Sequence, residues 1–313
     1  MKLTNKNILI TGANGMIAYQ LINLLKTKNC NLTLTDIQEK SKFFDDEKYV
    51  GGDLRSRSFT QSICKGQDIV FSLVGMKGSP QRCLEAPASL SIPMTQFNAN
   101  VIESAHKNDV EWLMYTSTIG VYEPAEVFNE DDVWKTFPSK NDWYGGWAKR
   151  MGELHIESLS IEHNWNRASI VRPANVYGPY DNFGEWSMVI PSLIKKGFEN
   201  DIIEVWGDGS PIRDIVYSED VARGMIHMVE NEVTAPVNLG SGTGVTIKEI
   251  AEIISEYFDK ELIWDTTKPM GDMKRLMNTE RANSYGFYPQ TSLKDGIKKT
   301  IEFYEEGINE LLR

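Results

Sequence analysis

Short apolar runs alternate with amphipathic stretches along most of this chain. The first apolar run, residues 8–10, leads through Thr-Gly-Ala-Asn-Gly into an amphipathic segment that begins at Met16. Further strands are expected at residues 32–35, 49–50, 68–75, 111–116 and 168–172, with a helix near 97–108 and a polar surface loop over 123–142. Because strands separated by helices pair in parallel, the pattern predicts an α/β fold with a doubly wound parallel sheet. Ligands of such a sheet bind at the carboxyl ends of its strands.

The turn after the first strand carries two glycines at dinucleotide-binding spacing. Gly12 allows the tight turn, and Gly15 lets the backbone approach a pyrophosphate at the N-terminus of the following helix. Ala18 stands where the usual fingerprint has its third glycine, and its small side chain still permits close packing of helix on strand. A Gly-x-x-Gly pair also occurs in ordinary strand-to-helix turns, so the context decides the interpretation.

Asp36 supplies that context, since it ends the second predicted strand about twenty residues after the glycines. A carboxylate at this place accepts hydrogen bonds from the adenosine ribose hydroxyls and repels a 2′-phosphate. The sequence therefore predicts a Rossmann domain that binds NAD in preference to NADP.

Length and composition set the outer limits. The 313 residues suffice for a large α/β unit and a smaller lobe. We expect the NAD-binding domain at residues 1–171, with part of 214–245 returning to it, and a substrate-binding lobe mainly at 172–313. The net charge of −11 argues against partners such as nucleic acid or an anionic membrane. Cys30, Cys64 and Cys83 lack C-x-x-C spacing, so neither a disulfide framework nor a metal site is expected.

The first strand begins almost at the N-terminus, and no run approaches the roughly 20 apolar residues of a membrane span. A cytoplasmic protein without a signal peptide is the resulting expectation.

Several motifs together resemble the extended short-chain dehydrogenase/reductases that act on nucleotide sugars, over essentially the whole chain. The resemblance rests on the Thr-Gly-Ala-Asn-Gly turn, on Gly-Asp-Leu at 52–54, on the Ser/Thr-rich strand end at 116–122 and on Arg-Pro-Ala-Asn-Val-Tyr-Gly-Pro at 172–179. Residues 180–183, 206–213 and 264–269 are similar to the GDP-fucose synthase branch of this group. The implied cofactor-binding residues are Gly12, Asn14, Gly15, Met16, Ile17, Asp36, Asp53, Leu54, Leu73, Gly75 and Lys149.

The resemblance implies hydride exchange between a sugar carbinol and the nicotinamide, which requires a base for the hydroxyl proton. Thr118 matches the family's catalytic Ser/Thr, and Lys149 matches its catalytic lysine. The family's tyrosine precedes that lysine by four residues, where this chain has Gly145, and Tyr144 lies one residue earlier. One residue is a 100° turn on a continuous helix, although two glycines allow an irregular first turn that would bring Tyr144 to the nicotinamide. Tyr144 is therefore the predicted catalytic base, and a missing base is the alternative.

In the second lobe the resemblance implies a clamp for the substrate diphosphate. Asn175 would donate to the diphosphate, and Arg213 would offer a charge-assisted contact to it or to the nucleotide ribose. An exposed ion pair between Arg213 and Asp214 is the structural alternative. The expected substrate-binding residues are Thr118, Asn175, Val189, Arg213, Lys268 and Arg275.

Two departures from the family narrow the reaction. Gly120 and Met188 occupy the places of the cysteine and histidine with which the GDP-fucose synthase branch epimerises carbons 3 and 5. Ile119 and Gly120 likewise replace the Asp-Glu pair of the sugar-nucleotide dehydratases. Redox at a single carbon, C4, remains, as in a 4-dehydrogenase or a 4-epimerase.

A catalytically silent NAD-binding sensor or partner subunit of the same fold is the second hypothesis. Retention of Asn175 and Arg213 favours the enzyme, because a sensor has no need of a diphosphate clamp. The composition, rich in Lys, Asn and Ile, favours a bacterial surface-polysaccharide pathway with a GDP-sugar substrate such as a GDP-heptose, and a homodimer or higher homo-oligomer.

Overall fold

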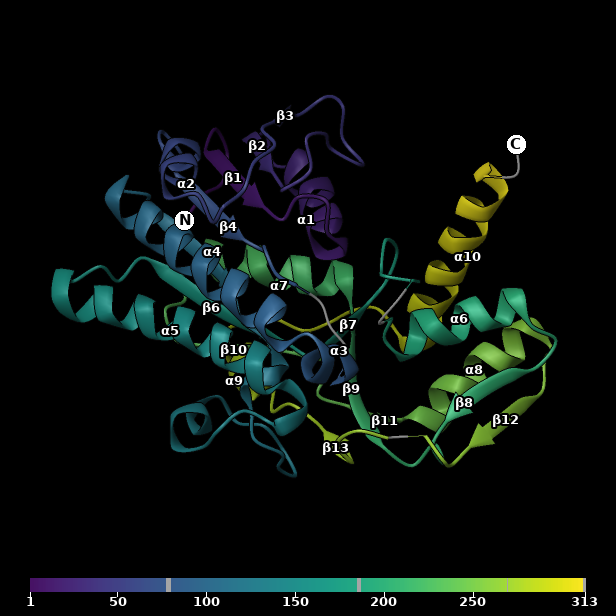
Figure 1. The fold of residues 1–313 in the computed structure, drawn as a ribbon. Helices are drawn as coiled ribbons and strands as arrows, with labels where there is room; N and C mark the ends of the chain where they lie inside the picture. Colours follow the sequence, from purple (N-terminus) through teal and green to yellow (C-terminus); the bar gives the residue numbers. More distant parts are fainter. Residues whose placement is uncertain (77–79, 185–186, 269, 312–313) are drawn as a thin grey trace.

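A seven-stranded parallel sheet organises the larger lobe of the computed structural model, which describes residues 1–76, 80–184, 187–268 and 270–311 (Figure 1). The strands lie in the order β10-β6-β5-β4-β1-β2-β3, and every neighbouring pair is parallel. Their bounds are β1 (Asn7–Thr11), β2 (Asn31–Thr35), β3 (Lys48–Tyr49), β4 (Ile69–Ser72), β5 (Trp112–Thr116), β6 (Ala168–Pro173) and β10 (Val237–Leu239). The order reverses direction between β1 and β4, and this reversal is where doubly wound sheets bind their ligands.

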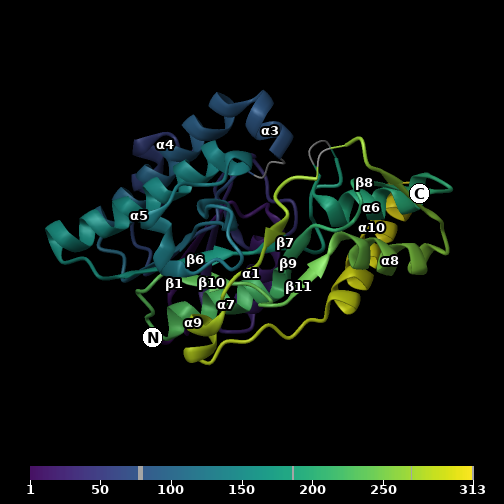
Figure 2. The ribbon, with the colours of Figure 1, turned by 90° about the horizontal axis from the view of Figure 1, so that it is seen from below.

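Helices cover both faces of the sheet. α1 (Met16–Lys26) and α7 (Ser218–Glu230) lie on one face, whereas α4 (Pro87–Lys107) and α5 (Trp143–His163) lie on the other (Figure 2). α2 (Arg57–Cys64) packs beside α4. Strands between two helical layers are apolar on both sides, and all four residues of β4 are buried. α1 shows the matching helical pattern, since its buried residues Ala18, Leu21, Ile22 and Leu25 recur every three or four positions.

The smaller lobe carries its own sheets and a separate apolar core. One sheet combines β7 (Asn175–Tyr177), β9 (Ile212–Tyr217), β11 (Gly244–Thr246) and β13 (Lys274–Arg275), and a second pairs β8 (Ile203–Trp206) with β12 (Leu262–Asp265). The helices of this lobe are α6 (Val189–Glu199), α8 (Ile247–Phe258) and α10 (Leu293–Leu311), whereas α9 (Glu280–Ser284) packs near β10. The shorter helices are α3 (Pro80–Glu85), η1 (Ile119–Val121), η2 (Glu130–Lys135) and η3 (Lys140–Asp142).

The predicted fold class is confirmed, and the differences lie at element boundaries. β4 ends at Ser72 rather than at residue 75, because the chain turns away where Val74 packs against the backbone of Gly12. α4 begins at Pro87, well before residue 97, since proline is favoured in the first helical turn. The loop at 123–142 contains the 3₁₀ helices η2 and η3. Along the described ranges, none of the helices is long and apolar enough to span a membrane.

A buried ion pair joins α5 to the sheet. Arg172 on β6 and Glu153 on α5 are both almost inaccessible to solvent, and the guanidinium Nη2 lies 2.6 Å from Glu153 Oε2. Arg172 also donates to Tyr122 Oη at 2.9 Å, and Ser117 Oγ donates to Glu153 Oε1 at 2.5 Å. Ser117 directly follows β5 and Tyr122 directly follows η1, so the network connects α5 to the carboxyl end of β5.

Removing one partner of this pair is expected to cost far more stability than removing an exposed partner. Arg172→Leu leaves the Glu153 carboxylate buried without its cation, so the free energy of unfolding should fall by about 3–5 kcal/mol. Arg167→Leu, which removes the exposed pair with Asp109, should cost about 1 kcal/mol or less. Urea unfolding followed by circular dichroism measures both changes, and equal losses would contradict the assigned role of the buried pair.

Candidate active site

The turn between β1 and α1 is shaped for a close approach of backbone and ligand. Gly12 has a φ of +69°, and a Cβ there would meet the backbone N and Cα of Val74 at 2.9 Å. At Gly15 a Cβ would meet Gly12 O at 3.1 Å, and this residue caps α1 without any side chain over the first amides, those of Met16 and Ile17. Uncapped N–H groups at a helix N-terminus bind phosphate, so these residues fit the pyrophosphate of NAD.

Asp36 lies at the carboxyl end of β2, next to this turn. Its Oδ2 accepts the backbone N–H of Asn14 at 3.2 Å, which fixes the carboxylate beside the predicted cofactor position. The side chain of Asn14 turns away from the cradle, where it donates to Gln38 Oε1 at 2.8 Å and accepts the N–H of Lys42 at 2.9 Å. Asn14 therefore anchors the loop after Asp36 through its side chain and offers only its backbone to the cradle.

Asp53 and Leu54 follow β3, at the same edge of the sheet. Asp53 forms an ion pair with Arg55 at 2.6 Å, and the hydrogen bonds from Arg55 lower the pKa of its carboxyl group. Leu54 is buried, and its carbonyl accepts from Thr60 and Asn100. Leu73 is partly buried and Gly75 exposed where the chain leaves β4. The structure thus brings the predicted cofactor residues to one edge of the sheet.

Thr118 and Lys149 lie at the same end of the sheet, near the carboxyl ends of its strands. Thr118 follows β5, and Lys149 belongs to α5. Thr118 caps η1, with its Oγ1 accepting the N–H of Gly120 at 3.2 Å. Lys149 is 5% exposed, and its Nζ donates to Val74 O at 3.3 Å. Burial lowers the pKa of Lys149 to about 7, against the opposite effect of the Glu153 carboxylate. α5 packs directly on η1, since a Cβ at Gly146 would lie 2.3 Å from Gly120 O.

Tyr144 lies apart from this pair in the structure. α5 is continuous from Trp143, so the irregular first turn that would bring Tyr144 to the nicotinamide is not present. The side chain of Tyr144 is 42% exposed. Tyr144 precedes Lys149 by five residues, so the two side chains point in directions about 140° apart around the helix axis. Gly145 occupies the place one turn before Lys149, where a Cβ would meet only Leu90 Cδ2, at 3.9 Å, among the described residues.

In the smaller lobe, Asn175 and Arg213 come from the neighbouring strands β7 and β9. Asn175 Nδ2 donates to Asp214 O at 2.9 Å. Arg213 Nη1 and Nη2 donate to the carbonyls of Ile212 and Met270, at 2.9 and 3.2 Å. Burial, and next to it the charge of Arg275, lowers the pKa of Arg213 to about 10. The guanidinium forms no ion pair with any described carboxylate, so it can receive an anion.

An exposed Arg213–Asp214 pair does not form, because consecutive strand residues point to opposite faces. The Asp214 side chain is buried instead, and it accepts the backbone N–H of Ser241 at 2.7 Å.

Arg275 is already neutralised by two carboxylates. It pairs with Asp272 at 2.6 Å and with Asp142, and these charges raise its pKa even though burial acts in the opposite direction. Asp272 also accepts from Asn141 Nδ2 at 2.6 Å, so the cluster ties the start of α5 to the smaller lobe. Arg275 therefore contributes to the architecture of the site, a role that its sequence context did not reveal.

Lys268 and Val189 lie at the margin of the lobe. Lys268 is exposed, with its Nζ 5.5 Å from the ring centroid of Trp206, and Lys196 Nζ lies 5.9 Å from the same ring. Val189 begins α6 and packs against the apolar core of the lobe. An exposed indole beside two lysines suits a nucleotide base and its phosphates, which makes Trp206 a residue to add to the candidate site.

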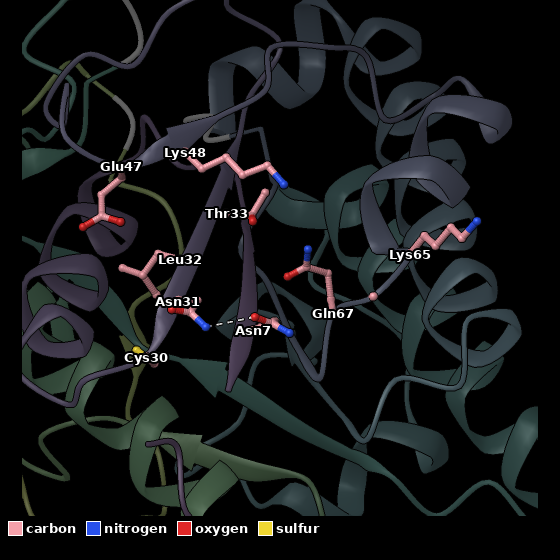
Figure 3. Close-up of a pocket in the computed structure, with 10 residues that line it drawn as sticks. Asn7, Cys30, Asn31, Leu32, Thr33, Glu47, Lys48, Lys65 and Gln67 are labelled. Carbon is pink, nitrogen blue, oxygen red and sulfur yellow. Dashed lines mark hydrogen bonds between the residues drawn. The ribbon is translucent and has the colours of Figure 1, made fainter. Parts of the chain in front are cut away.

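A depression of about 500 Å³ opens at the opposite edge of the main sheet (Figure 3). It is lined by Asn7, Asn31 and Lys48, the first residues of β1, β2 and β3, and Asn31 Nδ2 donates to Asn7 Oδ1 at 3.1 Å. Ligands of doubly wound sheets bind at the other ends of the strands, so this depression is not the candidate site. Within the described ranges, no group of His, Cys, Asp or Glu residues is arranged to hold a metal ion.

Residues 8–240 match the model of the NAD dependent epimerase/dehydratase family. The chain belongs to this family. It is 30% identical to a putative GDP-L-fucose synthase of Arabidopsis thaliana, over 96% of this chain and 92% of that protein. It is 29% identical to the GDP-L-fucose synthase of Sinorhizobium fredii, over 98% of each chain.

Among solved structures, an epimerase from Methanothermobacter thermautotrophicus superposes with a TM-score of 0.88 at 24% sequence identity, covering 98% of this chain and 94% of that one. The family resemblance and the NAD cofactor that the sequence predicts are confirmed by the family match.

The cofactor preference of this chain is expected to depend on Asp36. NAD should bind at least tenfold more tightly than NADP, a difference of about 1.4 kcal/mol, because the carboxylate repels a 2′-phosphate. Asp36→Ala should narrow the gap, whereas Asp45→Ala, an exposed change of equal charge in the following loop, should leave it unchanged. Isothermal titration calorimetry with both dinucleotides measures the effect, and equal affinities in the wild type would contradict the assignment.

Proposed function

We propose that this protein is an NAD-dependent oxidoreductase that acts at C4 of a nucleotide-diphosphate sugar. The observation that carries the proposal is the combination of three features, two at the carboxyl ends of the main-sheet strands and one on β9 of the smaller lobe. The uncapped start of α1 provides a pyrophosphate site, and Lys149 is buried on α5, the helix that packs on η1, which Thr118 caps. Arg213 offers from the smaller lobe a guanidinium that pairs with no described carboxylate. A dinucleotide and a second diphosphate ligand thus each have a binding group.

The substrate side of the proposal rests on charge. This acidic chain has to meet an anionic substrate with local cations. Arg213 is a partly buried arginine that forms no ion pair with a described carboxylate. Arg150 also lacks such a pair, but its buried guanidinium donates to the carbonyls of Val121 and Thr136. A guanidinium binds phosphate oxygens in a bidentate, charge-assisted manner.

Asn175 is proposed to donate beside this guanidinium, and Val189 and Lys268 are proposed to bound the substrate site. The part proposed for Arg275 is to hold this site in shape through its pairs with Asp142 and Asp272.

The chemical step is assigned to residues at the ends of β5 and α5. Thr118 is proposed to orient the substrate hydroxyl, because its Oγ1 is fixed by the N–H of Gly120. Lys149 is proposed to contact the nicotinamide ribose as well as the reacting centre. Bound NAD supplies the acceptor for the hydride that leaves the carbinol carbon. Tyr144 is the base that the sequence predicts, and that role would require the first turn of α5 to unwind.

The names of the relatives support a GDP-sugar as the substrate, and a GDP-heptose of bacterial surface-polysaccharide synthesis is our proposal for its identity. Net oxidation at C4 is the proposed reaction, and 4-epimerisation is its alternative. A cytoplasmic homodimer or higher homo-oligomer belongs to the same proposal.

A catalytically silent NAD-binding protein is the second candidate, and Gly145 is the observation that favours it. If the site has no proton acceptor, the chain binds both ligands without turnover. Reduction of NAD in the presence of GDP-sugars, followed at 340 nm, separates the two candidates.

Turnover in deuterated water is expected to leave carbons 3 and 5 of the sugar unlabelled. Gly120 cannot move a proton, and Met188, the N-cap of α6, cannot either. Mass spectrometry of the product sugar during initial turnover measures the label. Deuterium at these carbons would contradict redox at C4 alone, and it would direct attention to Asp142, whose carboxyl group packs against Gly120.

Arg213→Met is expected to weaken binding of a GDP-sugar at least tenfold, since a hydrogen bond to a charged group contributes about 1.5–3 kcal/mol. Binding of NAD should not change. Arg223→Met is the matched control, because Arg223 is a partly buried arginine that pairs with Asp220 on α7. Calorimetric titration with GDP-mannose measures all three proteins, and an unchanged affinity in Arg213→Met would remove this residue from the proposed site.

A further inference from the structure

One face of α5 lies against the carboxyl ends of the sheet strands. On this face, the position at which the family has its catalytic tyrosine is a glycine, Gly145. Residues four apart on a helix share a face, so Gly145 and Lys149 lie one above the other. Glu153 continues the same face one turn later, where it pairs with Arg172. The glycine presents no atom beyond its backbone, and the space where a side chain would begin is bounded only by Leu90 among the described residues.

Oxidation of an alcohol requires a group that takes the hydroxyl proton, and the nearby phenols are engaged elsewhere. Tyr115 is fully buried, and its hydroxyl donates to Lys149 O at 3.2 Å, in the space that Gly152 leaves. Tyr122 donates to Asn238 Oδ1 at 2.6 Å and accepts from Arg172. Burial raises the pKa of both phenols. Tyr144 lies on a different face of the helix, exposed to solvent.

The amine of Lys149 is placed where a proton acceptor is needed. Its Nζ lies 3.3 Å from Val74 O and 3.9 Å from the position of a Cβ on Gly75, at the end of β4 next to the glycine turn. The ring centroid of Tyr115 on β5 lies 5.2 Å away. The charge that acts on it comes from Glu153 on its own helix, and this carboxylate is already bound by Arg172 and Ser117. No described carboxylate forms an ion pair with Lys149, so the amine has no counter-ion in direct contact that would hold it protonated.

We propose that Lys149 itself is the general acid–base group of this site, taking the proton that the family assigns to a tyrosine. The inference rests on the proposed function. In the oxidising direction the O–H proton passes to the neutral amine, the O–H electron pair forms the C=O bond, and the hydride from C4 passes to NAD. The products are the 4-keto sugar, NADH and the ammonium of Lys149. A desolvated lysine is suited to this role, because burial disfavours its charged form and lowers the pKa of Lys149 to about 7.

The pH dependence of the oxidising step follows from this assignment. The amine is competent only when neutral, so the rate constant of a single turnover should rise with pH through the pKa of about 7 and then level off. A tyrosine at its ordinary pKa near 10 would still be protonated over this range.

The first experiment reads the ionisation of Lys149 without cofactor or substrate. Trace acetic anhydride acetylates neutral amines in competition with an added standard amine, and peptide mass spectrometry gives the relative reactivity at each pH. The reactivity of Lys149 should titrate near pH 7, and the peptide that carries exposed Lys107 is the internal comparison in the same digest. Titration of Lys149 near 10 would overturn the inference, whatever the activity of the enzyme.

The second experiment uses single turnovers with NAD and a GDP-sugar. Lys149→Ala should slow hydride transfer by 10²–10⁴-fold, and added primary amines should restore part of the rate, increasingly so for more basic amines. Lys107→Met is the control for loss of a lysine charge, and calorimetry should show that Lys149→Ala still binds the GDP-sugar. Retention of folding is checked by thermal melting.

Tyr144→Phe separates the two assignments of the base. If Lys149 carries the proton, this variant keeps the group that titrates near pH 7 in its pH profile. A loss of 10²–10⁴-fold in Tyr144→Phe, or the absence of amine rescue in a folded Lys149→Ala protein, would overturn the inference. Wild-type protein that binds NAD and GDP-sugars but never reduces NAD would refute the proposed function, and the role of Lys149 with it.

Discussion

The buried contact between Arg172 and Glu153 is the constraint on which the geometry of the site depends. It fixes α5 against β6, and through Ser117 and Tyr122 it also fixes the segment that carries Thr118. Two charges that have left water are stable only when their partners are held at short distance. The same requirement fixes the middle of α5 relative to the start of η1. The position of Lys149 therefore depends on the contacts of Glu153, one helical turn further along α5.

A second ionic arrangement connects the lobes, and it distributes the positive charge of the substrate side. Arg275 binds Asp142 and Asp272, whereas Arg213 on the adjacent strand donates to the backbone carbonyls of Ile212 and Met270. The two guanidiniums stand at paired positions of β13 and β9. Arg275 holds the lobes together and occupies both carboxylates. The positive charge of Arg213 therefore remains available for an anionic ligand.

The main features of the fold could be predicted from local sequence, but most partners within the site could not. The strand-turn-helix at Gly12 follows from an apolar run and the glycine spacing, and the parallel pairing of the strands follows from their alternation with helices, which are local patterns. Arg275 illustrates the limit, because its partner Asp142 is 133 residues away and nothing in the neighbouring sequence indicates the pairing. Once β9 is known to be a strand, the alternation of its side chains predicts that Arg213 and Asp214 point to opposite faces and form no ion pair. The regularity of the first turn of α5 depends on how the helix packs against η1. The two glycines in that turn allow either conformation, so the local sequence could not decide between them.

The two glycines at the start of α5 are under different constraints. A side chain at Gly146 would collide with Gly120 O, so close packing of α5 on η1 requires a glycine there. Gly145 meets no such obstacle, and its backbone is ordinary helix. The scaffold thus keeps room for a functional group that it does not contain. In evolutionary terms, the acid–base chemistry of such a site is separable from its architecture, because residue 145 can change identity while the sheet, the helix and both ligand-binding edges stay as they are.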